Sequence, residues 1–232
     1  MIWASAGDYV LEIHSDSYRT RGDYVFSLTD LFAAPQATDL DAVTLDAQPT
    51  PQITTTSVTL EAGKRYYFDT VSTSTASFWM QMGLVSPSGR LLSIDSISND
   101  IGAIEALESG QYTLFIWMNR TLDTPAGTVT LAVREPVRSF VDSPLNQTIS
   151  GEIEGAGDSV VHRFTLPKAG YYYFDSQTGS STLEWALRRN GVTEQSGRLN
   201  SDSGVNTSYL LAAGDYEVVI TGRDSNVGEY RF

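Results

Sequence analysis

One motif occurs three times along this chain of 232 residues, and its spacing constrains the fold more than any other feature. In each copy a small residue and a glycine precede a strand-like run that begins with an aromatic position and continues with apolar side chains. The aromatic position is held by Tyr9, Tyr112 and Tyr216, which lie 103 and 104 residues apart (112 − 9 and 216 − 112). Self-similarity at one fixed period indicates tandem copies of a structural unit of about 100 residues.

A second motif repeats with nearly the same period and sets the phase of the units. The Tyr-Tyr-Phe-Asp run at residues 66–69 recurs at 172–175, an offset of 106 residues (172 − 66). Prolines at Pro35 and Pro136 are typical of places where one unit ends and a stiff linker begins. We therefore expect the C-terminal strands of a preceding repeat at 1–34 and two β-sandwich repeats at 35–136 and 137–232.

Within each unit the hydrophobic period is two, which is the period of a β-strand. Tyr112, Leu114 and Ile116 would share one face of a strand, and the run at 216–220 repeats the pattern. Turn sequences, such as Asn190-Gly191, separate short β-branched and aromatic runs at intervals of roughly 8–12 residues. The predicted fold class is all-β, with tandem antiparallel β-sandwich domains.

The composition narrows the classes of function. Lys and Arg total 15 against 28 Asp and Glu, a net charge of −13, which disfavours binding to nucleic acid or to an anionic membrane surface. No apolar run is long enough to span a bilayer, so we expect no membrane insertion. The chain has no cysteine and only two histidines, His14 and His162, so it has no thiol chemistry and few side chains of the kinds that most metal sites use. We expect a protein that is not an enzyme.

The third copy resembles a known family along most of its length. Glycine turns, an aromatic strand and closing Tyr and Gly-x-Tyr motifs carry the resemblance, at residues 151–153, 157–158, 163–166, 169–171, 209–216 and 228–232. In this pattern the chain resembles bacterial pre-peptidase C-terminal domains arranged in tandem, as in large secreted or surface repeat proteins. The second copy departs from the pattern, because its opening stretch at 39–58 lacks the glycine-aspartate turn.

This resemblance implies a jelly-roll-like β-sandwich in an extracellular or cell-surface protein, some members of the family binding collagen, glycan or calcium. We expect a non-enzymatic repeat region that acts as a spacer or adhesive stalk, with neighbouring repeats of the same protein as partners. The alternative is a carbohydrate- or matrix-binding accessory module of a secreted hydrolase. A glycan or a matrix protein would be the external partner in either case.

The candidate ligand contact is Trp117. Trp79 and Trp185 correspond across the two complete copies, which suggests shared core packing, whereas Trp117 corresponds to His14 and Thr221. A tryptophan that only one copy carries at the end of a strand is the best candidate for an exposed contact with a sugar ring.

Two polar loops at comparable places in the complete copies could hold a metal ion. Their oxygen-bearing side chains are the ligands that calcium prefers, and the candidate ligands are Asp95, Asn99, Asp100, Asn200 and Asp202. Neither loop follows the EF-hand pattern, and Asp and Asn in such loops also cap turns through the local backbone. Calcium therefore stays open as a cofactor, with turn capping as the alternative.

The first copy lacks the opening half of a unit, so another part of the protein must bury the apolar face of its strands. Residues 6–13 and 22–29 should form two antiparallel strands, by correspondence with 213–220 and 228–232. An isolated pair of strands is marginal in water because it cannot bury its apolar face. The pair would either fold back onto the second copy, which we favour, or pair with the edge of a neighbouring molecule.

Overall fold

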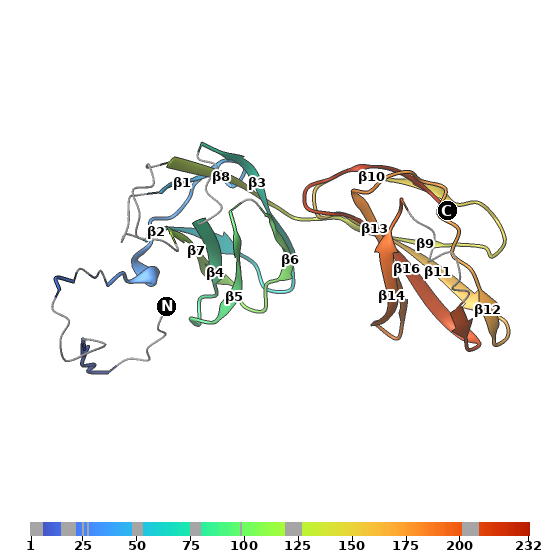
Figure 1. Ribbon diagram of the computed structural model, residues 1–232, viewed down its shortest axis with the longest axis horizontal. Helices are drawn as coiled ribbons and strands as arrows, with labels where there is room; N and C mark the ends of the chain where they lie inside the picture. Colours follow the sequence, from blue (N-terminus) through green and yellow to red (C-terminus); the bar gives the residue numbers. More distant parts are fainter. Residues whose placement is uncertain are drawn as a thin grey trace.

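A computed structural model of the chain describes residues 7–14, 22–24, 26, 28–47, 53–74, 80–97, 99–118, 127–200 and 209–232. Apart from one short 3-10 helix, η1 (Leu31–Ala33), the regular structure in these ranges is all β-strand. No helix within the described residues is long and apolar enough to cross a membrane. The strands form two β-sandwiches that follow one another along the long axis of the molecule (Figure 1), which confirms the predicted fold class.

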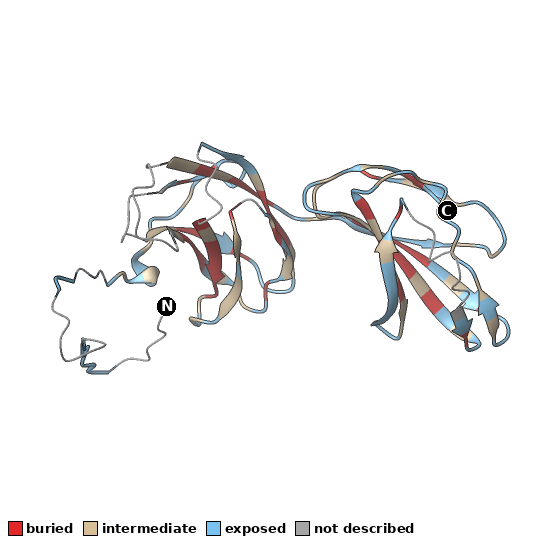
Figure 2. Cartoon of the chain, viewed as in Figure 1, coloured by how far each residue is buried: buried red, intermediate tan, exposed pale blue. Residues whose placement is uncertain are grey.

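The first sandwich consists of two four-stranded antiparallel sheets. One sheet has the order β1-β8-β3-β6, with the bounds Val43–Ala47, Gly127–Arg134, Arg65–Thr73 and Ile101–Glu105. The other has the order β2-β7-β4-β5, with the bounds Thr54–Leu60, Gly110–Met118, Met80–Val85 and Leu91–Ser96. Their facing sides bury the predicted apolar positions, including Phe68, Tyr112 and Leu114 (Figure 2).

The second sandwich has one large sheet and two short strand pairs. The large sheet has the order β14-β13-β16-β11-β9, with the bounds Val192–Arg198, Leu183–Arg189, Gly214–Gly222, Ser159–Leu166 and Arg138–Asp142. The pairs are β10 (Ser150–Ile153) with β17 (Gly228–Arg231) and β12 (Gly170–Tyr172) with β15 (Tyr209–Leu211). Asn190 and Gly191, at positive φ angles of 51° and 78°, make the predicted turn between β13 and β14.

The two sandwiches repeat one strand arrangement. In the first, β7 lies between β2 and β4, and in the second β16 lies between β11 and β13. Tyr112 and Tyr216 occupy these central strands and are both buried, as the repeat predicts. Phe68 lies within β3, whereas its counterpart Phe174 lies just after β12 ends, and Trp79 lies outside the described residues.

Each sandwich also begins with a parallel contact. In the second, the whole of β9 pairs in parallel with β11. In the first, a single parallel bridge joins Gln36 to Ser57 of β2, supported by bonds from Ala37 N to Ser57 O (2.8 Å) and from Ser57 N to Pro35 O (2.7 Å). The strands of the two sandwiches fall within the predicted ranges 35–136 and 137–232.

The N-terminal segment differs from the prediction. No strand is present in the described residues of the expected pair, and the apolar side chains there are exposed. Contacts with the first sandwich are made by residues that follow the expected strands: Thr113 Oγ1 donates to Leu31 O (2.9 Å) and Phe32 lies beside Gly89. The physical reason is that the described sandwiches already contain their own central strands, so they offer the N-terminal copy no place in a sheet.

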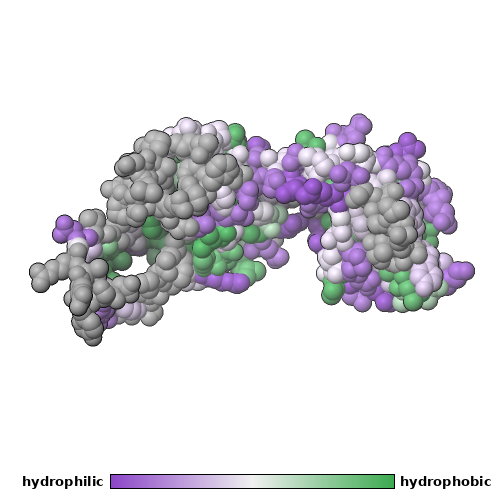
Figure 3. Space-filling model, viewed as in Figure 1, coloured by the Kyte–Doolittle hydropathy of each residue, from purple (hydrophilic) through white to green (hydrophobic). Residues whose placement is uncertain are grey.

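A short joint connects the sandwiches. Strand β8 ends at Arg134 and β9 begins at Arg138, and Val137 between them donates its N–H to Asp158 Oδ1 (2.6 Å). The ring of Tyr67, on the outer side of β3, lies against Gly157 in the turn before β11. Figure 3 shows that the surface over this junction is hydrophilic in the view drawn.

Candidate functional site

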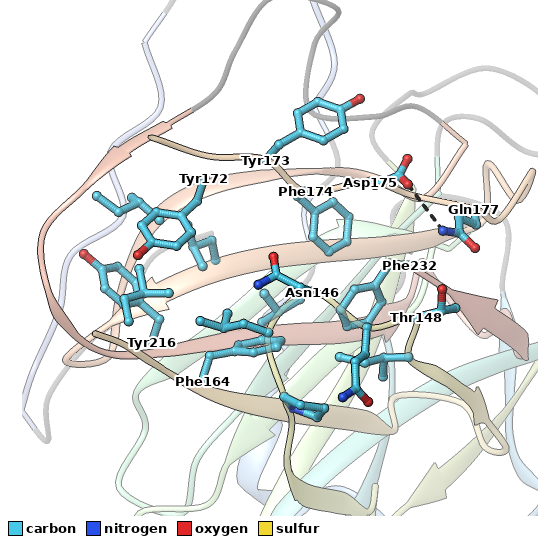
Figure 4. A pocket seen from close by; sticks show the side chains of 18 residues that line it. Asn146, Thr148, Phe164, Tyr172, Tyr173, Phe174, Asp175, Gln177, Tyr216 and Phe232 are labelled. Carbon is cyan, nitrogen blue, oxygen red and sulfur yellow. Dashed lines mark hydrogen bonds between the residues drawn. The ribbon is translucent and has the colours of Figure 1, made fainter. Parts of the chain in front are cut away.

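A concave site with an aromatic lining lies in the second sandwich. It is a pocket of about 350 Å³ between the loop at 144–149, the residues 172–177 that continue β12, and the ends of the large sheet (Figure 4). Six aromatic residues line it, namely Phe164, Tyr172, Tyr173, Phe174, Tyr216 and Phe232, and of these the ring of Tyr173 points away from the others (Figure 4). Pockets of this size that are mostly apolar with a few polar groups are the usual form of a small-ligand site.

Packing of the rings fixes one wall of the pocket. Phe174 stacks on Trp185 with ring centroids 4.4 Å apart and lies 5.0 Å from Phe232. Trp185 is buried in the core on β13, so the ring of Phe174 rests on a rigid base. Tyr172 is oriented by its hydroxyl, which donates to Lys168 O (2.9 Å). The aromatic wall is therefore held in place before any ligand arrives.

The polar side of the pocket comes from a tight loop and from the segment after β12. Asn146 has a positive φ of 60°, a conformation that asparagine tolerates better than most residues, and it turns the chain at the rim. Gln177 Nε2 donates to Asp175 Oδ2 (3.3 Å), as Figure 4 shows, while Gln177 N donates to Arg231 O (2.9 Å). The rim thus presents amide and carboxylate groups with fixed positions.

The described lining contains no Lys, Arg or His and one carboxylate, Asp175. A phosphate or carboxylate ligand would find no cation there, so the pocket suits a neutral ligand. Hydroxyl groups of such a ligand could bond to Asn146, Asp175 and Gln177, while its apolar face would contact the rings of Tyr172 and Phe174. A neutral sugar ring has this combination of hydroxyls and an apolar face.

A buried polar chain that sequence reasoning missed lies beside this pocket. His162 of β11 is 2% exposed; its Nδ1 lies 2.9 Å from Ser143 Oγ, and its Nε2 lies 2.8 Å from Tyr230 Oη. Burial lowers the pKa of His162 and raises the pKa of Tyr230 to about 12. These residues are 19 and 68 positions apart, so no local pattern could reveal their contact.

The hydrogen-bonded series Ser143–His162–Tyr230 is better suited to holding a loop in position than to catalysis. A hydrolytic Ser–His pair requires the imidazole to take a proton, and a carboxylate usually stabilises the resulting cation. Here the second partner of His162 is the neutral hydroxyl of Tyr230, and burial disfavours the charged ring. The chain therefore ties the loop that carries Ser143 to β11 and β17, next to the pocket.

Trp117 lies at the end of β7, half-buried, with its ring stacked on Phe115 at a centroid distance of 5.3 Å. It points to the same side of β7 as Thr113 and Phe115, away from the core side that holds Ile116. It belongs to the first sandwich and is not part of the pocket. Contact between Trp117 and a sugar stays a prediction.

The first polar loop brings two of the candidate calcium ligands, Asp95 and Asn99, into contact, and directs the third, Asp100, toward β3. Asp95 Oδ1 accepts hydrogen bonds from Ser96 N (2.7 Å) and Asn99 Nδ2 (2.9 Å). The carboxylate of Asp100 accepts from the Tyr67 hydroxyl (2.6 Å) and from the Thr70 amide (2.7 Å). The bonds of Asp95 are those of a capped turn, the alternative reading of the loop, whereas those of Asp100 tie the loop to β3.

The second polar loop is described only in part. Asn200 is exposed in the turn that follows β14, and Asp202 lies outside the described residues. Within the described ranges no three Asp, Glu, His or Cys side chains are grouped so that they could hold a metal ion. Calcium binding at these residues remains a prediction.

Comparisons with known proteins add little to this geometry. No protein-family model matches the chain, and no curated protein matches it. Among solved structures, the CUB1-EGF-CUB2 domain of human MASP-1/3 is similar at 8% sequence identity, covering 82% of this chain and 97% of that chain, with a TM-score of 0.23. A TM-score at this level carries no argument about family or function, so the all-β sandwich fold is established by the strands themselves.

Proposed function

We propose that this chain is a non-enzymatic segment of an extracellular tandem array of β-sandwiches, serving as a spacer or adhesive stalk of a bacterial surface or secreted protein. The repeat motifs and the likeness to pre-peptidase C-terminal domains support the array and its location. The net charge of −13 would keep such arrays soluble and apart from one another. The observation that carries the proposal is the joint between the two sandwiches.

The joint leaves the linker little freedom. Only residues 135–137 separate β8 from β9, and proline at 136 restricts the backbone. Both polar backbone groups of Val137 form hydrogen bonds to the second sandwich. Its N–H donates to Asp158 Oδ1, and its carbonyl accepts from Ser159 N (2.9 Å). A stalk requires such a connection, since freely rotating domains would not hold a distal part away from a surface.

The side-chain contact at the joint is tight. Tyr67 is 4% exposed, and burial followed by its hydrogen bond to Asp100 raises the pKa of its hydroxyl. Burial, and then the charge of Arg138 in the second sandwich, lower the pKa of Arg65, which lies two residues before Tyr67 on β3. Both effects come from side chains on the side of β3 that faces the second sandwich.

The joint can be tested by single-molecule energy transfer. Because the chain has no cysteine, Ala62→Cys in the first sandwich and Gln195→Cys in the second would be labelled uniquely, and both sites are exposed. We expect one narrow distance distribution that broadens with Gly157→Asn, because asparagine tolerates the φ of 79° but adds a Cβ against the Tyr67 ring. The matched control is Gly191→Asn, which has a φ of 78° and open space around it.

Gly191→Asn should leave the distribution narrow. A broad distribution in the unmodified chain would show that the sandwiches move independently, and the stalk proposal would then fail. A narrow distribution that Gly157→Asn does not change would show that Tyr67 and Gly157 do not hold the joint.

The pocket favours a second candidate function, a carbohydrate- or matrix-binding accessory module of a secreted hydrolase. Its test is binding of the full chain to arrays of neutral glycans and matrix proteins, with and without calcium. We expect a neutral glycan to bind without calcium and Tyr172→Ala to weaken binding at least tenfold, roughly the effect of losing one stacked ring. Tyr171→Ala is the matched control, since the neighbouring Tyr171 is 72% exposed and does not line the pocket.

A further inference from the structure

The sequence that builds the central strand of each sandwich occurs a third time, in residues 7–14, where it is exposed. In the complete copies the aromatic position is buried, at 1% exposure for Tyr112 and 3% for Tyr216. In the N-terminal copy Leu11 is 58% exposed and Ile13 is 47% exposed. The same pattern of side chains is therefore core in two places and surface in the third.

The N-terminal copy shares one backbone feature with the other two, although its described residues form no strand. The glycine that precedes the tyrosine has a positive φ in all three copies: 159° at Gly7, 148° at Gly110 and 134° at Gly214. In the second and third copies this glycine is the first residue of the central strand. The glycine at the start of the N-terminal copy thus shares this φ range with the first residue of each central strand.

The closing strand shows the same correspondence. Tyr24 and Phe26 stack with centroids 6.3 Å apart and an interplanar angle of 17°. Tyr230 and Phe232, their counterparts at the end of the third copy, stack at 6.2 Å and 17°. In the third copy these two rings pack on the core of the sandwich, whereas Tyr24 and Phe26 are 65% and 58% exposed.

We propose that the described residues of 7–14 and 22–26 are the central and closing strands of a third sandwich, and that they dock into the opening strands of a repeat that precedes them. This inference rests on the proposed tandem array. A second copy of the chain is a poor partner, because β7 and β16 already fill the central position in each described sandwich. The occupant must instead be a sandwich that lacks these strands.

The two sides of residues 7–14 differ in polarity, and this difference indicates which side would face the core of the partner. Tyr9, Leu11 and Ile13 fall on one side of an extended strand and match the core-facing positions of β16. The other side carries Glu12 and His14, whose side chains lie 3.1 Å apart and are exposed. The apolar side would face the core of the partner and the Glu12–His14 side would face solvent.

A graft can supply the missing half. Residues 137–212, which contain β9 to β15, would be placed before Ala6 of this chain, because Ala6 corresponds to Ala213. The readout is amide hydrogen exchange of residues 7–14 in the grafted chain and in the unmodified chain. We expect exchange at least about 100-fold slower in the graft, as for a strand in the centre of a sheet. Leu11→Asp with Ile13→Asp in the graft should restore fast exchange.

Two controls make every outcome decisive. A graft in which residues 213–232 replace 6–26 shows that the added half folds when it receives its own closing strands. If that control folds while 7–14 stay unprotected in the test graft, the proposal is wrong. A dimer of the unmodified chain in light scattering, with 7–14 protected, would also overturn it in favour of pairing between molecules. Both results would leave the joint between the described sandwiches, and hence the proposed stalk, untouched.

Discussion

Gly157 has no room for a side chain, because a Cβ at this position would lie 2.5 Å from Cδ2 of Tyr67 in the other sandwich. The hydroxyl of Tyr67 also has a hydrogen-bond partner, since it donates to Asp100 Oδ2 at 2.6 Å. One residue therefore contacts a turn of the second sandwich with its ring and a loop of the first with its oxygen. The loop with Asp95, Asn99 and Asp100 was the predicted calcium site, and in the structure its Asp100 orients the Tyr67 side chain at the joint.

The hydrogen bond from Tyr67 should contribute measurably to stability. Tyr67→Phe leaves the ring on Gly157 but deprives Asp100 of a donor, so we expect the free energy of unfolding to fall by about 1–3 kcal/mol in chemical denaturation. Tyr171 in the second sandwich is 72% exposed, and Tyr171→Phe should change stability by less than about 0.5 kcal/mol. Equal effects of the two variants would contradict this account.

The residues just before the first sandwich should stabilise it although they form no strand ladder. Deleting 1–29 keeps η1 with its capping residue Asp30, and keeps the parallel bridge, so the melting temperature of the first sandwich should not change. Deleting 1–37 removes the acceptors of Thr113 Oγ1 and Ser57 N, and we expect a loss of roughly 2–3 kcal/mol from several lost hydrogen bonds. If both deletions are neutral in calorimetry, the segment contributes nothing.

Gly83 of β4 should tolerate no Cβ. A methyl group there would overlap the ring of the fully buried Phe115, so Gly83→Ala should cost about 1–3 kcal/mol through overpacking. Gly102 of β6 is the matched control, because no atom lies within 4 Å of its would-be Cβ. Denaturant titration of the two variants measures the difference, and a neutral Gly83→Ala would refute the packing described around Phe115.

Stability should depend on pH through His162. Its folded pKa lies below the ordinary value of about 6.5, so the unfolded chain binds a proton more readily than the folded one. The stabilisation is complete above about pH 6.5 and is lost as the pH falls through the lowered folded pKa. Equilibrium unfolding between pH 7.5 and pH 5 measures this dependence, and His162→Gln should flatten it.

Turnover is not expected. Protease, esterase and glycosidase substrates should give no reaction above background, because both ring nitrogens of the buried His162 are bonded to hydroxyl groups, which do not stabilise its protonated form as a carboxylate would. Activity that disappears in both Ser143→Ala and His162→Ala would mean that the Ser143–His162 pair is catalytic and that the protein is an enzyme.

Much of the fold was predictable because the core positions repeat. The alternation around Tyr112 and Tyr216 specifies one buried face in each central strand, and the structure places both as expected. The recurrence of the aromatic run at 172–175 did not reveal where its strand ends: Phe68 lies within β3, but β12 ends at Tyr172 and Phe174 stacks on Trp185. Sequence gives the tendency to form a strand, but a strand also needs a partner edge.

The candidate site was less predictable, for a related reason. The pocket joins residues from the loop at 144–149, from 172–177 and from the C-terminal Phe232, which are close only after the sheets form. The only local signal was the aromatic run at 171–174, whose alternate rings had to face opposite sides. The pair Ser143 and His162 gave no signal at all, because nothing in either neighbourhood specifies the other.

The parallel pairing of β9 with β11 has a mechanical consequence. Tension along the chain would enter the second sandwich through Val137 and pull on β9, which is paired in register from Arg138 to Asp142. The bonds of a parallel pair are evenly spaced, so a pull along the strand loads them together in shear and not one after another. The first sandwich has only the single bridge at Gln36 in the corresponding place. Under load the N-terminal attachment of the first sandwich should yield at a lower force than that of the second.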